Sequence, residues 1–129
     1  RSPGASAYLY EFTWKTPVLG GILKTPHTLC IPFVFGTLAA SEAFVGAGAA
    51  QEALSQNVMG AWLAFARVGD PNHDGLPVWP ALDDKSRPTM VFDDDCTLVN
   101  DPKPEDRIAI NTCPPFISDQ QFSGGSAAA

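Results

Sequence analysis

The sequence has little positive charge, few cysteines and no long apolar run. Its 129 residues include 8 Lys and Arg against 14 Asp and Glu, a net charge of −6. This acidity argues against nucleic-acid binding, which needs a basic face. No apolar stretch approaches the roughly 18 to 20 residues of a membrane-spanning helix, and the first residues lack the apolar core of a signal peptide. Three cysteines are too few for a disulfide-built scaffold, and an odd number leaves one thiol free or paired outside the chain.

The composition is otherwise that of a chain with a packed core. Hydrophobic residues make up 45% and charged residues 17%, which argues against wholesale disorder. The chain begins with Arg1 instead of Met, and we expect a processed or cut product. Residues 120–129 end in Ser-Gly-Gly-Ser-Ala-Ala-Ala, which is typical of a flexible linker. We therefore expect the fold within residues 1–119.

Residues 7–14 are aromatic and apolar with one charge, Glu11. Their composition favours a strand buried on both faces, as in a mostly parallel sheet. No other segment has this character, so we expect the strand's neighbours to lie outside the chain. Residues 15–26, with two Thr-Pro pairs and Gly20-Gly21, predict a loop.

A helix is predicted from about residue 51. The apolar positions that recur at spacings of three and four are Leu54, Val58, Ala61, Trp62 and Phe65. They form one face of a helix, and we expect Trp62 and Phe65 in the core. Gly69 can adopt the left-handed conformation that ends a helix, and Pro71 blocks continuation.

Two short β-prone runs, residues 89–92 and 96–99, predict a hairpin. The acidic residues 93–95 between them are expected to form its turn. We do not expect a metal site there, because three successive carboxylates cannot all face one metal ion. Asp101 then predicts the cap of a short helix with Pro102 at its first position.

The chain contains 2 histidines. His27 stands on a Pro-marked loop just before the apolar run 31–35, which predicts a turn of helix or a short extended piece, whereas His73 lies in a polar turn that we expect to be solvated. An imidazole with a pKa of roughly 6.5 accepts and returns a proton near neutrality. From the pattern alone, a loop histidine held by a backbone carbonyl is the simpler interpretation of His27.

Taken in order, several motifs resemble the C-terminal quarter of the type B carboxylesterases, a family of α/β-hydrolase fold. They are Tyr8-Leu9-Tyr10-Glu11-Phe12, the His27 loop running into Ile31-Pro32-Phe33-Val34-Phe35-Gly36, the helix with Trp62-Leu63-Ala64-Phe65-Ala66-Arg67, Gly69-Asp70-Pro71-Asn72, and Pro77-Val78-Trp79-Pro80. The resemblance runs from about residue 7 to about residue 107. It implies an α/β segment that is not a self-sufficient domain: the last strand of the large sheet, a histidine loop, a long helix, a small hairpin and a short terminal helix.

The resemblance also implies the chemistry of a serine-dependent carboxylic-ester hydrolase that uses no cofactor. It makes His27 the catalytic histidine, while the nucleophilic serine and the triad acid belong to the remainder of the esterase. Gly4-Ala5-Ser6-Ala7-Tyr8 is not the G-x-S-x-G nucleophile motif, because it lacks the final glycine and precedes a strand. Glu11 lies inside a strand, so we reject it as the acid and expect it to pair outside the chain. Cys30 stands where the family usually has a glutamate, which puts the local loop packing in doubt.

Substrate contacts and cysteine pairing follow from the same resemblance. Trp14 and Leu19 lie near His27 in sequence and are predicted to line a pocket for a small-molecule ester, although core packing is the alternative, above all for Phe33. The family often ties its C-terminal region upstream by a disulfide, which would give Cys113 a partner outside the chain in an oxidising compartment. Reduced cysteines are equally open.

Alternatives remain for the ion and for the activity. Residues 70–75 imitate a calcium loop, but position twelve is Ala81 instead of a bidentate glutamate, so we expect a solvated turn and no metal. Some members of the family have lost the serine and act as binding or adhesion proteins, and an excised structural fragment is a further possibility. Neither a nucleic acid nor a membrane is an expected partner.

Overall fold

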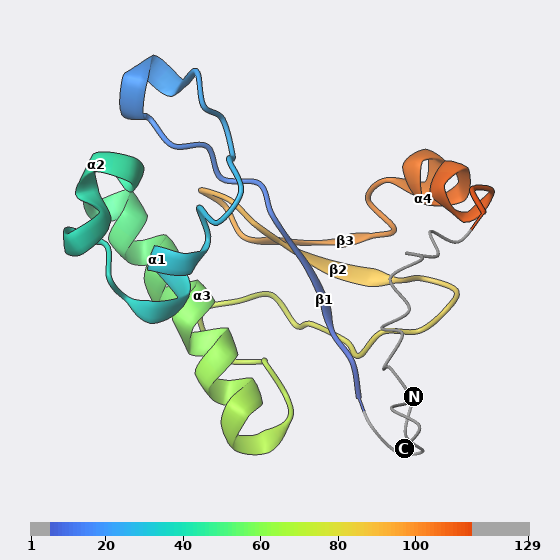
Figure 1. Ribbon diagram of the computed structural model, residues 1–129. Coiled ribbons are helices and arrows are strands. Elements are labelled where there is room, and N and C mark those ends of the chain that lie inside the picture. The colour runs from blue at the N-terminus through green and yellow to red at the C-terminus, as the bar shows by residue number, and fades with distance from the viewer. Residues whose placement is uncertain (1–5, 115–129) are drawn as a thin grey trace, which may run out of the picture.

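The computed structural model describes residues 6–114 and shows a small sheet with helices at either end of it (Figure 1). The strands are β1 (Leu9–Phe12), β2 (Pro88–Phe92) and β3 (Thr97–Asn100), and the helices are α1 (Ile31–Phe35), α2 (Glu42–Val45), α3 (Ala49–Val68) and α4 (Pro104–Asn111), with 3₁₀ turns η1 (Val18–Gly21) and η2 (Ala39–Ser41). Helices α1, α2 and α3 gather on one side of the strands, and α4 lies at the opposite end (Figure 1). Within residues 6–114, no helix has the length and apolarity that a membrane crossing requires.

The sheet has the order β1-β2-β3. Strand β1 pairs with β2 in parallel, from Leu9 opposite Thr89 to Phe12 opposite Phe92, and β2 pairs with β3 in an antiparallel hairpin. The predicted hairpin and the predicted parallel pairing are both confirmed. The expectation that β1 has all its neighbours outside the chain is wrong, because β2 is its neighbour. Strand β2 is nearly fully buried, whereas β1 is only half-buried. The prediction that β1 is buried on both faces is therefore wrong, and β2 is the more buried strand.

Strand β1 has a free edge. It is the outer strand of the sheet formed by the described residues, and only one of its edges is paired. The hydrogen bonds that extend this pairing run from the backbone N–H groups of Thr13 and Trp14 to the carbonyl oxygen of Phe92. An unpaired edge presents backbone donors and acceptors that another strand can use.

Helix α3 ends as predicted but buries a narrower face. Gly69 has φ +75° and its N–H donates to the carbonyl of Phe65, the left-handed cap that glycine adopts without strain. The buried apolar row is Leu54, Val58 and Ala61. Trp62 and Phe65 are 47% and 45% exposed, so their predicted place in the core is wrong. The apolar stripe of the helix is therefore buried up to Ala61 and half exposed beyond it.

Phe33 is the hub of the core. It is completely buried, and its ring lies 5.2 Å from that of Phe12 and 5.0 Å from that of Trp14. The hydroxyl of Ser55 donates to the Phe33 carbonyl at 2.9 Å, which ties α1 to α3. Residues 31–35 form a turn of helix. Through Phe33, whose ring packs on Trp14 and whose carbonyl bonds Ser55, this turn connects the segment after β1 to α3.

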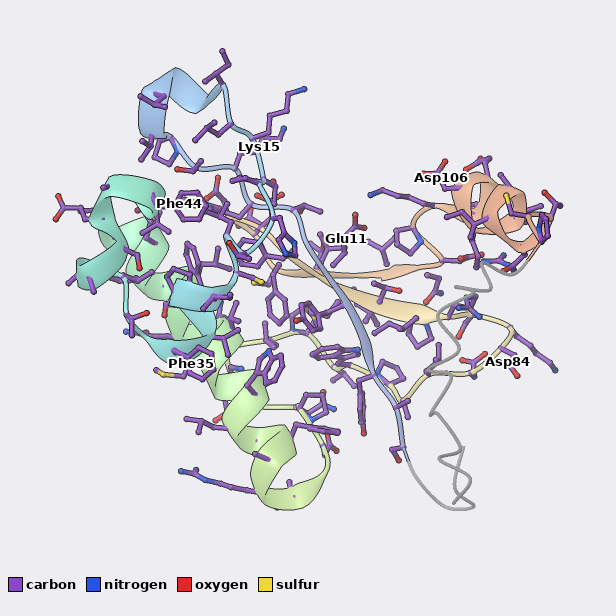
Figure 2. All side chains as sticks on the ribbon, viewed as in Figure 1. Glu11, Lys15, Phe35, Phe44, Asp84 and Asp106 are labelled. Atoms are coloured by element: carbon purple, nitrogen blue, oxygen red, sulfur yellow. The ribbon has the colours of Figure 1, made fainter. Side chains whose placement is uncertain are left out.

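Helix α4 begins later than predicted. Its first residue is Pro104, with Lys103 at the cap position, so Asp101 does not cap it. The Asp101 carboxylate instead accepts two hydrogen bonds from Arg107, at 3.0 and 2.7 Å. Glu11 points from β1 toward α4, on which Asp106 is labelled (Figure 2), and pairs with Lys103. The expectation that Glu11 pairs outside the chain is therefore wrong.

His73 is a structural residue and not a solvated one. The backbone N–H of Gly75 donates to its Nδ1 at 3.1 Å, and its Nε2 lies 3.0 Å from the carbonyl oxygen of Asn57 on α3. Because Nδ1 accepts, Nε2 carries the proton and donates to Asn57. The ring thereby fastens the loop after α3 back onto the helix.

Candidate active site

The loop that carries His27 is fastened to the end of β1. The hydroxyl of Thr25 lies 2.9 and 2.8 Å from the carbonyl oxygens of Thr13 and Trp14 and donates to this pair. The N–H of Thr16 donates to the carbonyl of Lys24 at 3.0 Å. This hydrogen bond joins the two ends of the loop 16–24, which we call the excursion. His27, two residues after Thr25, is therefore held at the carboxyl end of the parallel strand β1. In open α/β sheets this is the end at which ligands bind.

The chain after His27 is fixed equally firmly. Leu29 is 1% exposed, and its N–H donates to the carbonyl of Pro26 at 3.2 Å. Between them Thr28 has φ +72°, an uncommon conformation for a β-branched residue. Such a conformation costs on the order of 1–3 kcal/mol and persists where the surroundings enforce it. The buried Leu29 and the hydrogen bond to Pro26 hold the turn in this conformation.

His27 itself is exposed, and no residue in the described part of the chain forms a hydrogen bond with its imidazole. Both ring nitrogens can thus be approached from outside. The nucleophilic serine and the triad acid are predicted to lie outside this chain. The Glu11 carboxylate pairs with Lys103. The Gly4-Ala5-Ser6 motif begins outside the described residues.

The two predicted substrate residues have different environments. Trp14 is 4% exposed, packs on Phe33, and donates from Nε1 to Asp94 at 2.9 Å. Leu19 lies in η1 and is 72% exposed, with a positive φ of 54°. Figure 1 shows η1 extending away from the sheet. Of the two, only Leu19 presents an accessible apolar side chain.

Cys30, Cys96 and Cys113 are free thiols in this structure. Cys30 is the cap residue of α1 and half-buried. Burial raises the pKa of the Tyr10 phenol, and the charge of Cys30 raises it further. Burial also raises the pKa of Cys96, against hydrogen bonds with Asn57 and Asp93 that lower it.

The loop 70–75 is organised by its own side chains. The Asp70 carboxylate accepts from the backbone and the side chain of Asn72, which lower the pKa of Asp70. The Asn72 side chain in turn forms two hydrogen bonds with the backbone of Trp79: its Nδ2 donates to the carbonyl at 2.8 Å, and its Oδ1 accepts from the N–H at 2.7 Å. Within the described ranges, no group of His, Cys, Asp or Glu side chains has the arrangement of a metal site.

An aromatic pocket beside β1 was missed by sequence reasoning. It has a volume of about 170 Å³ and is lined mainly by aromatic side chains: Tyr8, just before β1, Tyr10 of β1, Trp62 and Phe65 of α3, and Trp79. The available signal was the alternation of Tyr8 and Tyr10, which places both on one face of a strand. The same signal was hidden by the assumption that the strand is buried on both faces.

Comparison with known proteins identifies the class and then the family. The carboxylesterase of Geobacillus stearothermophilus superposes with a TM-score of 0.69 at 38% identity, over 82% of this chain and 22% of that one. The para-nitrobenzyl esterase of Bacillus subtilis is 35% identical over 105 residues, 80% of this chain and 21% of its own. Carboxylesterase 5A of Canis lupus familiaris is 40% identical over 88 residues, 63% of this chain and 15% of its own. The chain thus has the α/β architecture of an α/β-hydrolase esterase segment, and the predicted fold class is confirmed.

A model of the carboxylesterase family matches residues 1–109. This chain belongs to the carboxylesterase family, as its motifs suggested. It spans about a fifth of the length of the para-nitrobenzyl esterase and of the solved carboxylesterase.

Proposed function

We propose that this chain supplies the general base of a serine-dependent carboxylesterase, and that His27 is that base. The observation that carries the proposal is an exposed imidazole without a hydrogen-bond partner in the described residues, on a turn that is anchored on both sides. A residue that must meet groups from another part of the protein needs a fixed backbone and an unoccupied ring. His27 has both.

The proposed chemistry follows from the proton balance of acyl transfer. A serine hydroxyl is a weak nucleophile, and His27 accepts its proton as the oxygen attacks the ester carbonyl. The same proton then goes from His27 to the leaving alcohol, and a water repeats the cycle to release the acid. The serine, the acid that orients His27 and the oxyanion donors come from the remainder of the esterase. Without that remainder, we expect residues 1–129 to be inactive.

The substrate class is a small-molecule carboxylic ester. Relatives carry names such as para-nitrobenzyl esterase, phenmedipham hydrolase and cocaine esterase, which describe those proteins. For this chain we propose that Leu19 meets the substrate, because it is exposed on the excursion that precedes His27. Trp14 would not contact the substrate itself. Its indole bonds Asp94 and its carbonyl accepts from Thr25, so it would hold the end of β1 and the start of the His27 loop in place. Residues 1–119 are proposed as part of one esterase domain; the tail 120–129 and the boundary at 119 lie outside the described residues.

The test is turnover of para-nitrophenyl acetate by the complete polypeptide that contains this sequence, with His27→Ala. Loss of a triad histidine should reduce kcat on the order of 10⁴-fold or more, equivalent to at least about 5 kcal/mol. Labelling of the serine by a fluorophosphonate should fall in parallel, because it requires the same activation. The thermal midpoint should change little, since His27 has no partner within the described part.

Lys15→Ala is the matched control, because Lys15 is also exposed near the end of β1 (Figure 2), and it should stay within about twofold of the parent. His73→Ala is the control for histidine content and should keep its kcat per folded molecule. Equal turnover by the His27→Ala and Lys15→Ala proteins would contradict the proposal. That result would favour a family member that binds without catalysis.

A further inference from the structure

The turn after α3 contains a glycine whose place leaves no room for a side chain. The backbone N–H of Leu76 donates to the carbonyl of His73 at 3.2 Å, so Asp74 and Gly75 occupy the two central positions of a β-turn. A Cβ built on Gly75 would sit 2.6 Å from Asn57 Oδ1 and 2.8 Å from the Cε1 of His73, and it would displace both side chains. Glycine leaves them in place, and Asp74 before it completes the only Asp-Gly pair in the sequence.

An aspartate that precedes a glycine can close a ring with the backbone. The glycine nitrogen attacks the Cγ of the aspartate, water leaves, and a succinimide forms. Hydrolysis of this ring at one carbonyl restores aspartate, and hydrolysis at the other gives isoaspartate, in which the chain runs through the side chain. Glycine permits the closure because it has no Cβ and its backbone moves freely. The step needs a base, since the amide nitrogen must lose its proton as the new bond forms.

A base already contacts the proton that has to leave. The N–H of Gly75 donates to Nδ1 of His73 at 3.1 Å. A backbone N–H that donates to a carbonyl oxygen keeps its proton, whereas a neutral imidazole nitrogen can take the proton up. The Nε2 of the same ring lies 3.0 Å from the carbonyl oxygen of Asn57, and this oxygen would stabilise the imidazolium that forms. The ring is thus a base held within hydrogen-bond reach of its proton.

The carboxyl group that the nitrogen must attack is accessible. Asp74 is exposed, and its carboxylate has no hydrogen bond or ion pair with the described residues. Asn72, in the same loop, has a side chain that could close on the backbone in the same way. Its amide is held by the Asp70 carboxylate and by the backbone of Trp79. The structure therefore leaves Asp74 free to react and holds Asn72 back.

We propose that Asp74-Gly75 is a site of spontaneous isoaspartate formation, with His73 as the general base. Nδ1 takes the Gly75 proton as the nitrogen bonds to Cγ of the protonated Asp74 carboxyl group, and this proton leaves with the hydroxyl as water. A second water opens the succinimide, so the reaction needs no oxidant, cofactor or other protein. Isoaspartate adds a methylene to the backbone between His73 and Gly75, which would separate the Gly75 N–H from the ring and loosen the loop from α3. The proposal does not depend on the esterase function.

Ageing of the complete polypeptide that contains this sequence tests the proposal. The protein is incubated at neutral pH, folded in buffer or unfolded in urea. Isoaspartate is measured by mass spectrometry with electron-transfer fragmentation, and the succinimide appears as a species lighter by one water. We expect isoaspartate at Asp74 to form about tenfold or more faster in the folded protein, because only the fold holds the ring against the N–H and a positioned base contributes about 10²–10⁴-fold. Asp84 is the internal control: it is exposed and followed by Lys85, and it should stay unmodified.

Variants of His73 separate a base from a structural anchor. His73→Gln keeps an acceptor for the Gly75 N–H but no base, and it should slow the modification about tenfold or more. Asp74→Asn keeps the base and loses ammonia instead of water, so it should still form the succinimide, and adding His73→Gln should slow it by the same factor.

Three results would overturn the proposal. Slower modification in the folded parent than in urea, or faster modification in folded His73→Gln, would mean that the ring protects the turn by holding it rigid. Equal rates in parent and His73→Gln would mean that the ring takes no part. The comparison of folded and unfolded protein uses the parent alone, so it decides the question even where a variant fails to fold.

Discussion

Replacing Gly60 by Ala should destabilise the protein, although alanine is the better helix former. Gly60 lies in the interior of α3, and a Cβ built there would sit 2.9 Å from His73 Nε2 and 3.0 Å from its Cε1. Carbon atoms do not approach a neighbour this closely, so the ring must move. It cannot move freely, because Nε2 donates to Asn57 and Nδ1 accepts from Gly75.

The magnitude follows from two opposing effects. Alanine in a helix interior is favoured over glycine by about 1 kcal/mol. Displacing the ring loses two hydrogen bonds of about 0.5–1.5 kcal/mol each and adds overpacking of about 1–3 kcal/mol. The second effect exceeds the first, and we expect the free energy of unfolding to fall by about 1–5 kcal/mol.

The sign should reverse once the ring is removed. His73→Ala alone should cost about 1–2 kcal/mol through its lost hydrogen bonds. In that background Gly60→Ala meets no obstacle and should raise the free energy of unfolding by about 0.5–1 kcal/mol. Urea unfolding of the four proteins of this double-mutant cycle gives the coupling directly. Ala53→Gly, at an exposed position of the same helix, calibrates the helix propensity.

A stabilising Gly60→Ala in the parent background would refute the reasoning. It would mean that the His73 ring can move at no cost in the free energy of unfolding, and that this ring does not hold the loop 70–75 to α3. A destabilising effect of equal size in both backgrounds would also refute it, because the cost would then not come from His73.

Three further results are expected. Cys96 should react with iodoacetamide at pH 8 more slowly than Cys113, because burial raises the pKa of Cys96 whereas Cys113 is exposed; equal rates would contradict this. The Arg107 guanidinium lowers the pKa of Asp101. This pair should therefore stabilise the fold fully above the unfolded pKa of about 3.9, and its effect should be lost as pH falls through the lower folded pKa. Asp101→Asn should remove that part of the acid dependence of unfolding followed by circular dichroism. Calorimetric titration of the loop 70–75 with millimolar calcium should give no saturable heat, because position twelve lacks a bidentate glutamate, and a one-site isotherm would overturn this prediction.

Local signals predicted the parts of the fold that local physics determines. The end of α3 at Gly69 follows from the conformational freedom of glycine, and the hairpin of β2 and β3 follows from two β-prone runs around an acidic turn. For residues 31–35 the local signals left a turn of helix and a short extended piece open, and the structure has the turn of helix, closed by Gly36 with φ +63°. Each of these depends on residues a few positions apart.

Errors arose where partners lie far apart in sequence. Glu11 meets Lys103 and β1 meets β2 across most of the chain, and no periodicity reports such pairings. Trp62 and Phe65 were assigned to the core from spacing, but spacing does not say how wide a face the neighbours cover. His73 looked solvated because its turn is polar, whereas its acceptor is a backbone carbonyl of α3, which has no sequence signature.

The two histidines illustrate how the same side chain serves different purposes in one chain. His73 has both ring nitrogens satisfied by backbone groups, as a structural imidazole should. Neither ring nitrogen of His27 is satisfied by the described residues, yet its neighbours are held in place: Thr25 bonds the end of β1, and Leu29 is buried. A residue retained only for packing would be expected to bond its own chain, and a residue of a mobile loop would lack such anchors. A fixed backbone with an unoccupied ring fits a group whose partners arrive from elsewhere in the protein, which supports His27 over His73 as the base.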